Sequence, residues 1–345
     1  MKTEPFRPTA LRFAAATTAC LAVSAMAFGQ DRGNISVTMF SDYYTVLEHN
    51  DPAVNGMNGF WFRRIYLTYD RTLEEGFSAR LRLEALSPGD FTTAGSLTTK
   101  YKDVYLMHTG ERHRAYFGLT PTPAILNYES FHPGYRAVEK TPLDLYMMAT
   151  TRDTGFGLKS TMGGGTRYWL MVGNDSGTTS ETNKGKAFYV TVSRDLSDKV
   201  VGEVNLIYAD KVGGDHWTTV AGFLGFTGEG YDASLFYGHQ TRSISGGPNV
   251  DMDVLSFFVG ARGNPKSRPF LRVDLMGNPV PGGDTIPYLQ LATTANPMLV
   301  IFGVDMALSE NVHLIPNIEW VTYSGATGPT PSNDLFFRLT VSASF

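Results

Sequence analysis

The chain has 345 residues, with 29 Lys and Arg against 33 Asp and Glu and a formal net charge of −4. This charge argues against nucleic acid as a partner, because nucleic acids are bound by basic surfaces. Cys20 is the only cysteine, so the composition excludes a disulfide framework. Glycine and aromatic residues are abundant, with 36 Gly and 12% Phe, Trp and Tyr.

The first 29 residues have the pattern of an export signal. Lys2, Arg7 and Arg12 precede a small and apolar run, 13–28, that is too short and too rich in alanine for a membrane span. Cys20 has a threonine three positions earlier, where a lipoprotein signal needs a leucine-like residue, so we interpret 1–29 as a cleaved signal peptide. Cleavage would leave 26 basic and 32 acidic residues, a net charge of −6, and no cysteine.

The mature chain, 30–345, contains no apolar stretch of the roughly 20 residues that a spanning helix needs. If it enters a membrane, it does so as a closed β-barrel, since only helices and closed barrels satisfy their backbone hydrogen bonds in lipid. A single barrel also suits its length better than one soluble core.

Period-two alternation predicts sixteen strands. In chain order they are 35–47, 60–70, 77–86, 101–109, 114–119, 154–160, 167–173, 187–194, 200–209, 217–226, 232–240, 252–262, 268–276, 297–307, 312–322 and 335–345. Fourteen or eighteen strands are the alternatives, because 114–119 and 154–160 are short and 285–292 could form a further strand.

The connections alternate between seven short turns and eight longer loops. The short turns are 71–76, 110–113, 161–166, 195–199, 227–231, 263–267 and 308–311. An all-β transmembrane antiparallel barrel with both termini in the periplasm requires this alternation, with its long loops outside the cell. A soluble sandwich has the same strand pattern but no reason to segregate its loops.

The last strand ends on an aromatic residue. Leu335, Phe337, Leu339 and Val341 share one side of 335–345, and the chain ends at Phe345. This pattern is typical of the closing strand of an outer-membrane barrel. We therefore expect Phe345 to be a C-terminal assembly signal for the barrel-assembly machinery, and 35–47 to pair with 335–345.

Alternation also assigns side chains to the lipid or to the lumen. In 77–86, Leu81 and Leu83 share one side and Arg80 and Arg82 the other. An arginine facing lipid at the midplane costs about 2 to 4 kcal/mol, so the charged side is predicted to face the lumen. The predicted pore-lining residues are Arg64, Arg80, Arg82, Glu84, Lys159, Arg272, Asp274, Asp305, Glu319 and Arg338, with Asp70 and Glu203 on the same side.

Each inward charge has an alternative interpretation as part of an ion-pair ladder that braces the wall. Glu319 and Arg338, on adjacent strands, are the clearest such pair. Trp61, Trp169 and Trp320 fall near strand ends and are predicted to face outward, in the aromatic girdles at the membrane interfaces.

The longest connection, 120–153, has structure of its own. Thr141, Pro142 and Asp144 form a helix start that predicts a short helix to about residue 149. Connections of this length are usually functional, so we expect 120–153 to fold into the lumen as a constriction; an external cap on the rim is the alternative. Its candidate constriction residues are Tyr135, Arg136, Glu139, Lys140, Arg152 and Asp153.

Part of the chain resembles the bacterial porins of the phosphate-selective porin O and P type and their broader relatives. The resemblance lies in 60–70 with 77–84, in 117–123, in Tyr135-Arg136 and Glu139-Lys140, and in 151–155. It implies a 16-stranded, often trimeric, passive channel, which in the best-known members is lined by arginine and lysine for anions. In general porins the third outer loop, here 120–153, narrows the lumen. This chain has no dense basic ladder in its sequence, so phosphate selectivity is not carried over.

The sequence contains no catalytic signature. Its seven histidines lack metal-ligand spacing, no GxSxG elbow occurs, and Gly163–Gly165 is interpreted as a tight turn. We predict no catalytic residue, metal or cofactor. The predicted function is an outer-membrane porin of a Gram-negative-type bacterium, a homotrimer in outer-membrane lipid that passes small polar or ionic solutes. The alternatives are a barrel for specific uptake, adhesion or assembly, or a barrel hydrolase.

Overall fold

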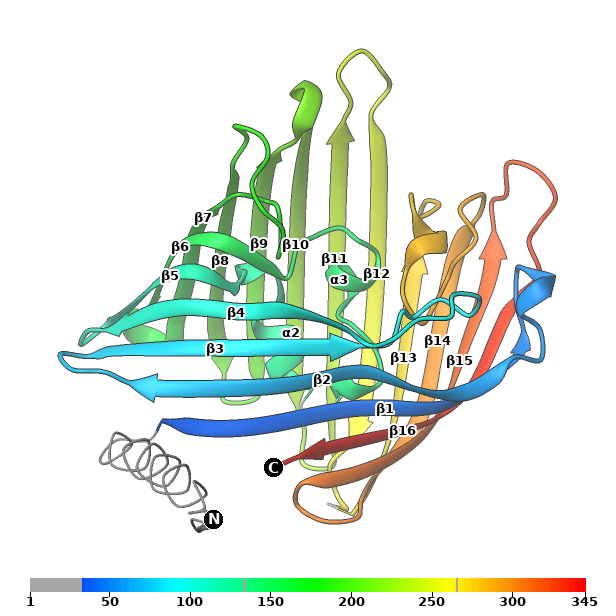
Figure 1. The fold of residues 1–345 in the computed structure, drawn as a ribbon, viewed down its shortest axis with the longest axis horizontal. Helices are drawn as coiled ribbons and strands as arrows, with labels where there is room; N and C mark the ends of the chain where they lie inside the picture. The colour runs from blue at the N-terminus through cyan, green and yellow to red at the C-terminus, as the bar shows by residue number, and fades with distance from the viewer. Residues whose placement is uncertain (1–32, 133–134, 265) are drawn as a thin grey trace, which may run out of the picture. The chain divides into compact units, whose positions relative to one another are not determined.

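A computed structural model describes residues 33–132, 135–264 and 266–345, so the predicted signal peptide and Cys20 lie outside the described residues. The chain forms a closed barrel of sixteen antiparallel strands, each paired with its neighbours in the sequence (Figure 1). The strands are β1 Asn34–Glu48, β2 Asn58–Thr72, β3 Phe77–Leu86, β4 Thr98–Thr109, β5 His113–Pro121, β6 Arg152–Thr161, β7 Thr166–Gly173, β8 Ala187–Ser197, β9 Val200–Asp210, β10 His216–Thr227, β11 Tyr231–Ser243, β12 Val250–Ala261, β13 Ser267–Met276, β14 Asn296–Ala307, β15 Val312–Ser324 and β16 Asp334–Ser344.

The prediction of sixteen strands is confirmed, and each predicted end lies within three residues of the observed one. Closure occurs as expected: β1 pairs antiparallel with β16, with Thr38 opposite Ser344. Phe345 extends this pairing, because its backbone N–H donates to the Val37 carbonyl at 3.0 Å and its carbonyl accepts from the Val37 N–H at 2.7 Å. The segment 285–292 is not a further strand.

The helical elements are short and lie in the connections. They are α2 Leu126–Phe131, α3 Pro142–Leu145 and the 3-10 turns η1 Pro52–Val54, η2 Pro123–Ile125, η3 Tyr135–Ala137, η4 Gly163–Gly165, η5 Val212–Gly214 and η6 Gly283–Thr285. The predicted helix after Thr141 exists, but it ends four residues early, and Met147 follows with a positive φ of 56°. No helix within the described ranges is long and apolar enough to cross a membrane.

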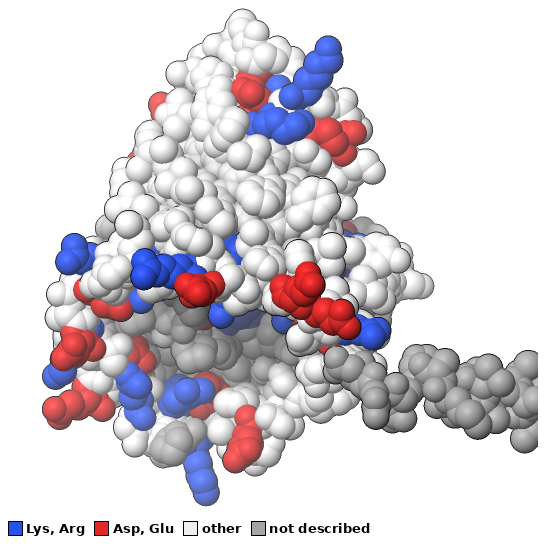
Figure 2. All heavy atoms as spheres, turned by 90° about the vertical axis from the view of Figure 1, so that its left-hand side faces the viewer, with Lys and Arg blue, Asp and Glu red and all other residues white. Residues whose placement is uncertain are grey.

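The barrel wall is apolar on its outer side. On β3, Phe77 and Leu81 are exposed, whereas Glu84 on the opposite side has no exposed surface. On β16, Phe337 faces outward and Arg338 is fully buried. The visible face in Figure 2 has a broad zone without acidic or basic side chains, with both signs above and below it. The alternation in the sequence therefore assigned the two sides of these strands correctly.

Two long loops fill much of the interior. We name the connection 122–151 loop 3 and the connection 277–295 loop 7. In loop 3, Leu143, Leu145 and Tyr146 have almost no exposed surface, and in loop 7 the same holds for Ile286 and Leu289. In Figure 1, α2 and α3 lie within the barrel. The apolar side chains of these loops pack together inside the barrel, so the barrel has a hydrophobic core in its interior.

The prediction that Trp61 and Trp169 face outward is wrong. Trp61 is 9% exposed and stacks on Tyr44 at 4.0 Å between ring centroids, while its Nε1–H donates to Asp42. Trp169 is 4% exposed and lies under the Lys159 ammonium. An indole at a strand end can pack its ring against polar and aromatic groups of the lumen, as both tryptophans do. Trp320 is 41% exposed and faces outward as predicted.

Candidate channel constriction

Loop 3 is hydrogen-bonded to one side of the barrel interior. The Tyr146 hydroxyl donates to Asp274 on β13 at 2.9 Å, and Arg272 on the same strand donates to the Lys140 carbonyl at 2.6 Å. The Met148 carbonyl accepts from side chains of β10 and β11. These contacts hold the second half of loop 3 against β10–β13.

A buried ion cluster fastens loop 3 to the seam of the barrel. Arg63 on β2 contacts the Glu139 carboxylate at 2.5 Å and Asp42 on β1 at 3.6 Å. Burial opposes ionisation of Glu139, but Arg63 and Lys140 outweigh it and lower the pKa of Glu139 to about 2. The carboxylate is therefore charged at neutral pH, as the ion pair with Arg63 requires.

The same cluster reaches loop 7. Arg338 on β16 donates to Glu319 at 2.9 Å and to the Tyr288 carbonyl in loop 7. The Glu319–Arg338 pair is thus the brace that their adjacent strands suggested. The Tyr288 hydroxyl lies 2.9 Å from the Ser87 carbonyl and 3.2 Å from the Arg63 carbonyl, which ties loop 7 to β2 and β3.

Facing loop 3 across the lumen, β2, β4 and β6 present basic side chains. Arg64, Lys100, Lys102 and Arg152 line an open cavity of about 290 Å³ toward the long-loop end of the barrel, which we name the outer cavity and which loop 3 and loop 7 border. A narrower cavity of about 20 Å³ adjoins it and shares Lys102 and Arg152. Both cavities lie between loop 3 and the basic side chains of β2, β4 and β6.

The carboxylates on this wall are fewer than the basic side chains that contact them. Lys100 and Lys102 contact Glu84 at 3.5 and 3.3 Å, and Arg64 also binds it. Arg82 and Arg152 both contact Asp103, at 3.2 and 2.6 Å. Five basic side chains therefore share two carboxylates. We name these five residues, Arg64, Arg82, Lys100, Lys102 and Arg152, the basic wall.

Loop 3 itself is close to neutral where it faces the basic wall. Arg136 contacts Glu129 at 3.0 Å and Asp144 at 3.6 Å. Lys140 lines the outer cavity, and burial lowers the pKa of its ammonium. The passage therefore has a positive wall opposite a nearly neutral loop.

Irregular backbone positions two members of this arrangement. The β3–β4 register shifts between Arg82 and Leu83, which leaves Lys102 as an extra residue and turns the consecutive Lys102 and Asp103 to the same side. Arg63 and Arg64 are likewise consecutive and both buried. Strict alternation cannot predict either pair, since it sends neighbours to opposite faces.

Further basic residues lie toward the periplasmic end. Arg114 and Lys159 are directly opposite each other on β5 and β6, and the Lys159 ammonium lies 3.6 Å from the centroid of the Trp169 ring. With Arg167 they line a cavity of about 420 Å³. Arg80 pairs with Asp70 at 2.7 Å between the two regions.

The structure separates the predicted site residues into two groups. Arg64, Lys159, Arg136, Lys140 and Arg152 line cavities, and Arg80 and Arg82 are partly exposed beside them. The others contact loops or neighbouring strands instead of open lumen: Glu84, Arg272, Asp274, Glu319, Arg338, Glu139 and Asp153 have at most 1% exposed surface. Tyr135 and Asp305 line a separate cavity.

Sequence reasoning missed Lys100, Lys102, Arg63 and all of loop 7. Lys100 precedes the predicted strand 101–109, and alternation would place Lys102 on the outer side with Val104 and Leu106. The role of Arg63 depends on a contact 76 residues away, with Glu139, which no local pattern contains.

The barrel is similar to solved structures of bacterial outer-membrane porins and channels. An anion-selective porin from Comamonas acidovorans superposes with a TM-score of 0.69 at 12% identity, covering 92% of this chain and 100% of that one. The outer membrane protein OmpT of Vibrio cholerae, in its trimer form, has a TM-score of 0.63 at 10% identity and coverages of 91% and 99%. The outer membrane channel DcaP of Acinetobacter baumannii has a TM-score of 0.61 at 11% identity and coverages of 90% and 96%.

No protein-family model matches the sequence, and no curated protein matches it. At these identities the likeness defines the class of fold, a 16-stranded barrel of the porin type. The resemblance of 60–160 to the phosphate-selective type stays a prediction.

Proposed function

We propose that this protein is an outer-membrane porin, a water-filled channel for passive diffusion of small hydrophilic solutes, and that it prefers anions. The observation that carries the proposal is the basic wall, in which five basic side chains share Glu84 and Asp103 beside the cavities next to loop 3. A narrow passage with low-dielectric walls focuses such an excess of charge on the entering ion. Anions are therefore enriched in the passage and cations are repelled.

Three further observations support this proposal. The outer side of the barrel is apolar, as a wall in lipid requires. The similar barrel from Comamonas acidovorans is described as anion-selective, and that of OmpT was solved in a trimer form. The basic wall also lies within 60–160, the part of the chain that resembles phosphate-selective porins. We accordingly propose a homotrimer in the outer membrane, with no enzymatic activity.

The test is electrical. Purified protein in planar bilayers should give ohmic conductance steps, and a potassium chloride gradient should give a reversal potential of the sign for chloride preference. The double variant Lys100→Gln, Lys102→Gln should move that potential toward zero, because Glu84 then keeps only Arg64 as partner. Lys199→Gln, in an exposed periplasmic turn, is the matched control. A barrel without conductance would contradict the porin proposal, and an unchanged reversal potential in the double variant would contradict the role of the basic wall.

A further inference from the structure

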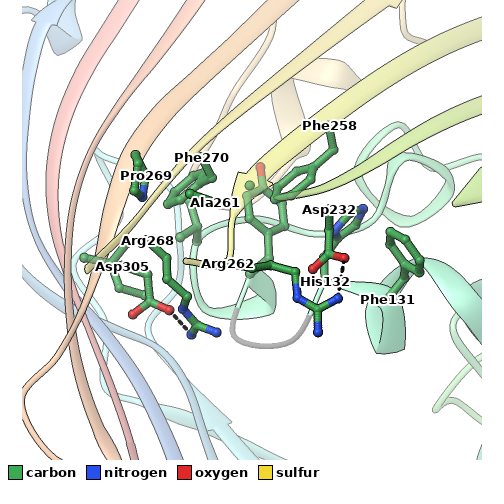
Figure 3. A pocket seen from close by; sticks show the side chains of 14 residues that line it. Phe131, His132, Asp232, Phe258, Ala261, Arg262, Arg268, Pro269, Phe270 and Asp305 are labelled. Carbon is green, nitrogen blue, oxygen red and sulfur yellow. Dashed lines mark hydrogen bonds and ion pairs between the residues drawn. The ribbon is translucent and has the colours of Figure 1, made fainter. Parts of the chain in front are cut away.

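A second cavity, of about 300 Å³, lies under loop 3 on the side away from the basic wall. It is lined by Phe131, His132 and Tyr135 from loop 3 and by the periplasmic halves of β11–β15 (Figure 3). This volume is at the lower end of the range of about 300–1,000 Å³ that small organic ligands occupy. The passage proposed above does not use it.

The walls of this cavity are aromatic. Phe258 and Phe270 lie nearly parallel, with ring centroids 6.2 Å apart and 8° between the planes. Tyr135 is perpendicular to both, at 4.8 and 5.3 Å. A planar ring entering the cavity can continue this edge-to-face arrangement, which aromatic groups prefer.

His132 contributes a ring and not a charge. Its Nε2 is 2.7 Å from the Ser234 hydroxyl, and its ring centroid is 3.8 Å from that of Phe258. Burial, assisted by the positive charge of Arg272, lowers the pKa of His132 to about 3. At neutral pH the histidine is therefore uncharged and belongs to the aromatic wall.

Two arginines lie at the rim of the aromatic wall. Figure 3 shows Arg262 and Arg268 below Phe258 and Phe270, each turned toward an aspartate. Arg262 contacts Asp232 through one nitrogen at 3.1 Å. Arg268 contacts Asp305 through one nitrogen, and His313 takes the other oxygen of that aspartate at 2.6 Å. A guanidinium has five N–H donors, so both arginines keep donors for a ligand.

We propose that this cavity is a binding subsite for aromatic monocarboxylates, with the ring of the ligand against Phe258 and Phe270 and its carboxylate at Arg262 and Arg268. The proposal rests on the proposed function in one respect: the solute reaches the cavity through the channel. An aliphatic acid lacks the stacking surface, and an uncharged aromatic compound lacks the group that the arginines bind.

The probe is benzoate, compared with acetate and benzyl alcohol. Calorimetric titration of the detergent-solubilised full-length protein should give saturable binding for benzoate and none for acetate or benzyl alcohol over the same concentration range. Equal binding of all three compounds, or of none, would overturn the proposal.

Variants test each half of the subsite. Phe270→Leu removes a ring while keeping an apolar side chain, and it should weaken benzoate binding about threefold to tenfold. Arg262→Gln should weaken benzoate binding as well. The controls are Phe302→Leu, on the exposed outer side of β14, and Arg71→Gln, an exposed arginine elsewhere. Heat-modifiable migration on a gel confirms that each variant is folded.

The outcomes distinguish this subsite from the porin function. Benzoate binding without any conductance in potassium chloride would contradict the porin proposal and leave the subsite supported. Normal conductance with benzoate affinity unchanged in Phe270→Leu and Arg262→Gln would overturn the subsite and leave the porin proposal intact.

Discussion

Arg63 and Arg64 are consecutive residues of β2, yet both side chains are buried inside the barrel, one on Glu139 of loop 3 and the other on Glu84 of the neighbouring strand. The two neighbouring arginines thus have different partners and different roles. Arg63 fastens the loop that narrows the lumen, and Arg64 belongs to the wall that the loop faces.

Arg63→Gln should loosen loop 3. Removing one partner of a buried ion pair leaves the other charge uncompensated and costs about 3 to 5 kcal/mol. We expect larger and noisier single-channel conductance, together with a lower transition temperature in gel-shift thermal unfolding. Arg71→Gln, on the exposed end of the same strand, should have neither effect. Wild-type conductance in Arg63→Gln would mean that the remaining contacts hold the loop without this ion pair.

Acidification should release loop 3 in two steps. His132 has a pKa of about 3 against an ordinary 6.5, so the stability it contributes is present above pH 6.5 and is lost as the pH falls toward 3. Glu139, with a pKa of about 2 against 4.5, acts in the same direction between pH 4.5 and 2. Conductance recorded between pH 7 and 4 should change in the wild type and stay constant in His132→Phe. Equal pH profiles in the two proteins would rule out His132 as the titrating group.

Shortening loop 3 should widen the channel. Replacing 124–150 by a short glycine linker removes the segment that occupies the lumen, and a barrel of sixteen strands without it leaves a wide aqueous channel. Single-channel conductance should rise clearly above the wild-type value. Reversing Arg136 and Lys140 to glutamate in the full-length loop should move the ion preference toward cations. If the deletion leaves conductance unchanged, loop 3 does not control the pore.

Cysteine accessibility should separate the two groups of predicted lumen residues. Cysteine at Lys100 or Arg80 should react with a small charged thiol reagent in intact membranes, since both side chains are partly exposed. Cysteine at Arg272 should react only in the protein that lacks 124–150, because loop 3 covers it. Cysteine at Leu339, on the outer side, should stay unlabelled in both proteins. Labelling at Leu339 but not at Lys100 would reverse the assignment of the two faces.

Deleting Phe345 should reduce assembly into the outer membrane. The residue pairs with Val37 at the closing seam, while its side chain is 76% exposed on the outer surface. The expected result is a lower yield of heat-modifiable barrel in the outer-membrane fraction. Phe345→Tyr, which keeps the aromatic ring, should assemble normally. Full assembly of the deletion variant would show that the signal lies elsewhere.

The strands were predictable because their determinants are local. Alternation in 77–86 predicts both the ends of β3 and the inward side of Arg80 and Arg82 without knowledge of the partner strands. The difference between short turns and long loops then predicts the order of pairing. Closure of the barrel then follows from pairing the first predicted strand, 35–47, with the last, 335–345.

The contents of the lumen were not predictable in the same way. The segment 285–292 alternates like a strand, but its residues pack against loop 2 (87–97) and β2, where Tyr288 finds its hydrogen bonds. Lys102 faces the passage because a register shift inserts it, which single-strand periodicity does not contain. The partners of loop 3 are likewise separated from it by up to 132 residues.

Loop 3 makes most of its hydrogen bonds to one side of the barrel, so the two sides differ in how well they tolerate amino-acid substitutions. On β10–β13, five inward side chains are hydrogen-bonded to the loop, namely Thr219, Gln240, Arg242, Arg272 and Asp274. A substitution of any of them affects folding before it affects transport. The basic wall contacts carboxylates of neighbouring strands and borders open cavities, so, unlike Arg63, its members can be exchanged with the loop still in place. Substitutions that change the solute preference, by design or in evolution, can therefore be made on β2–β6 while β10–β13 continue to hold loop 3 in place.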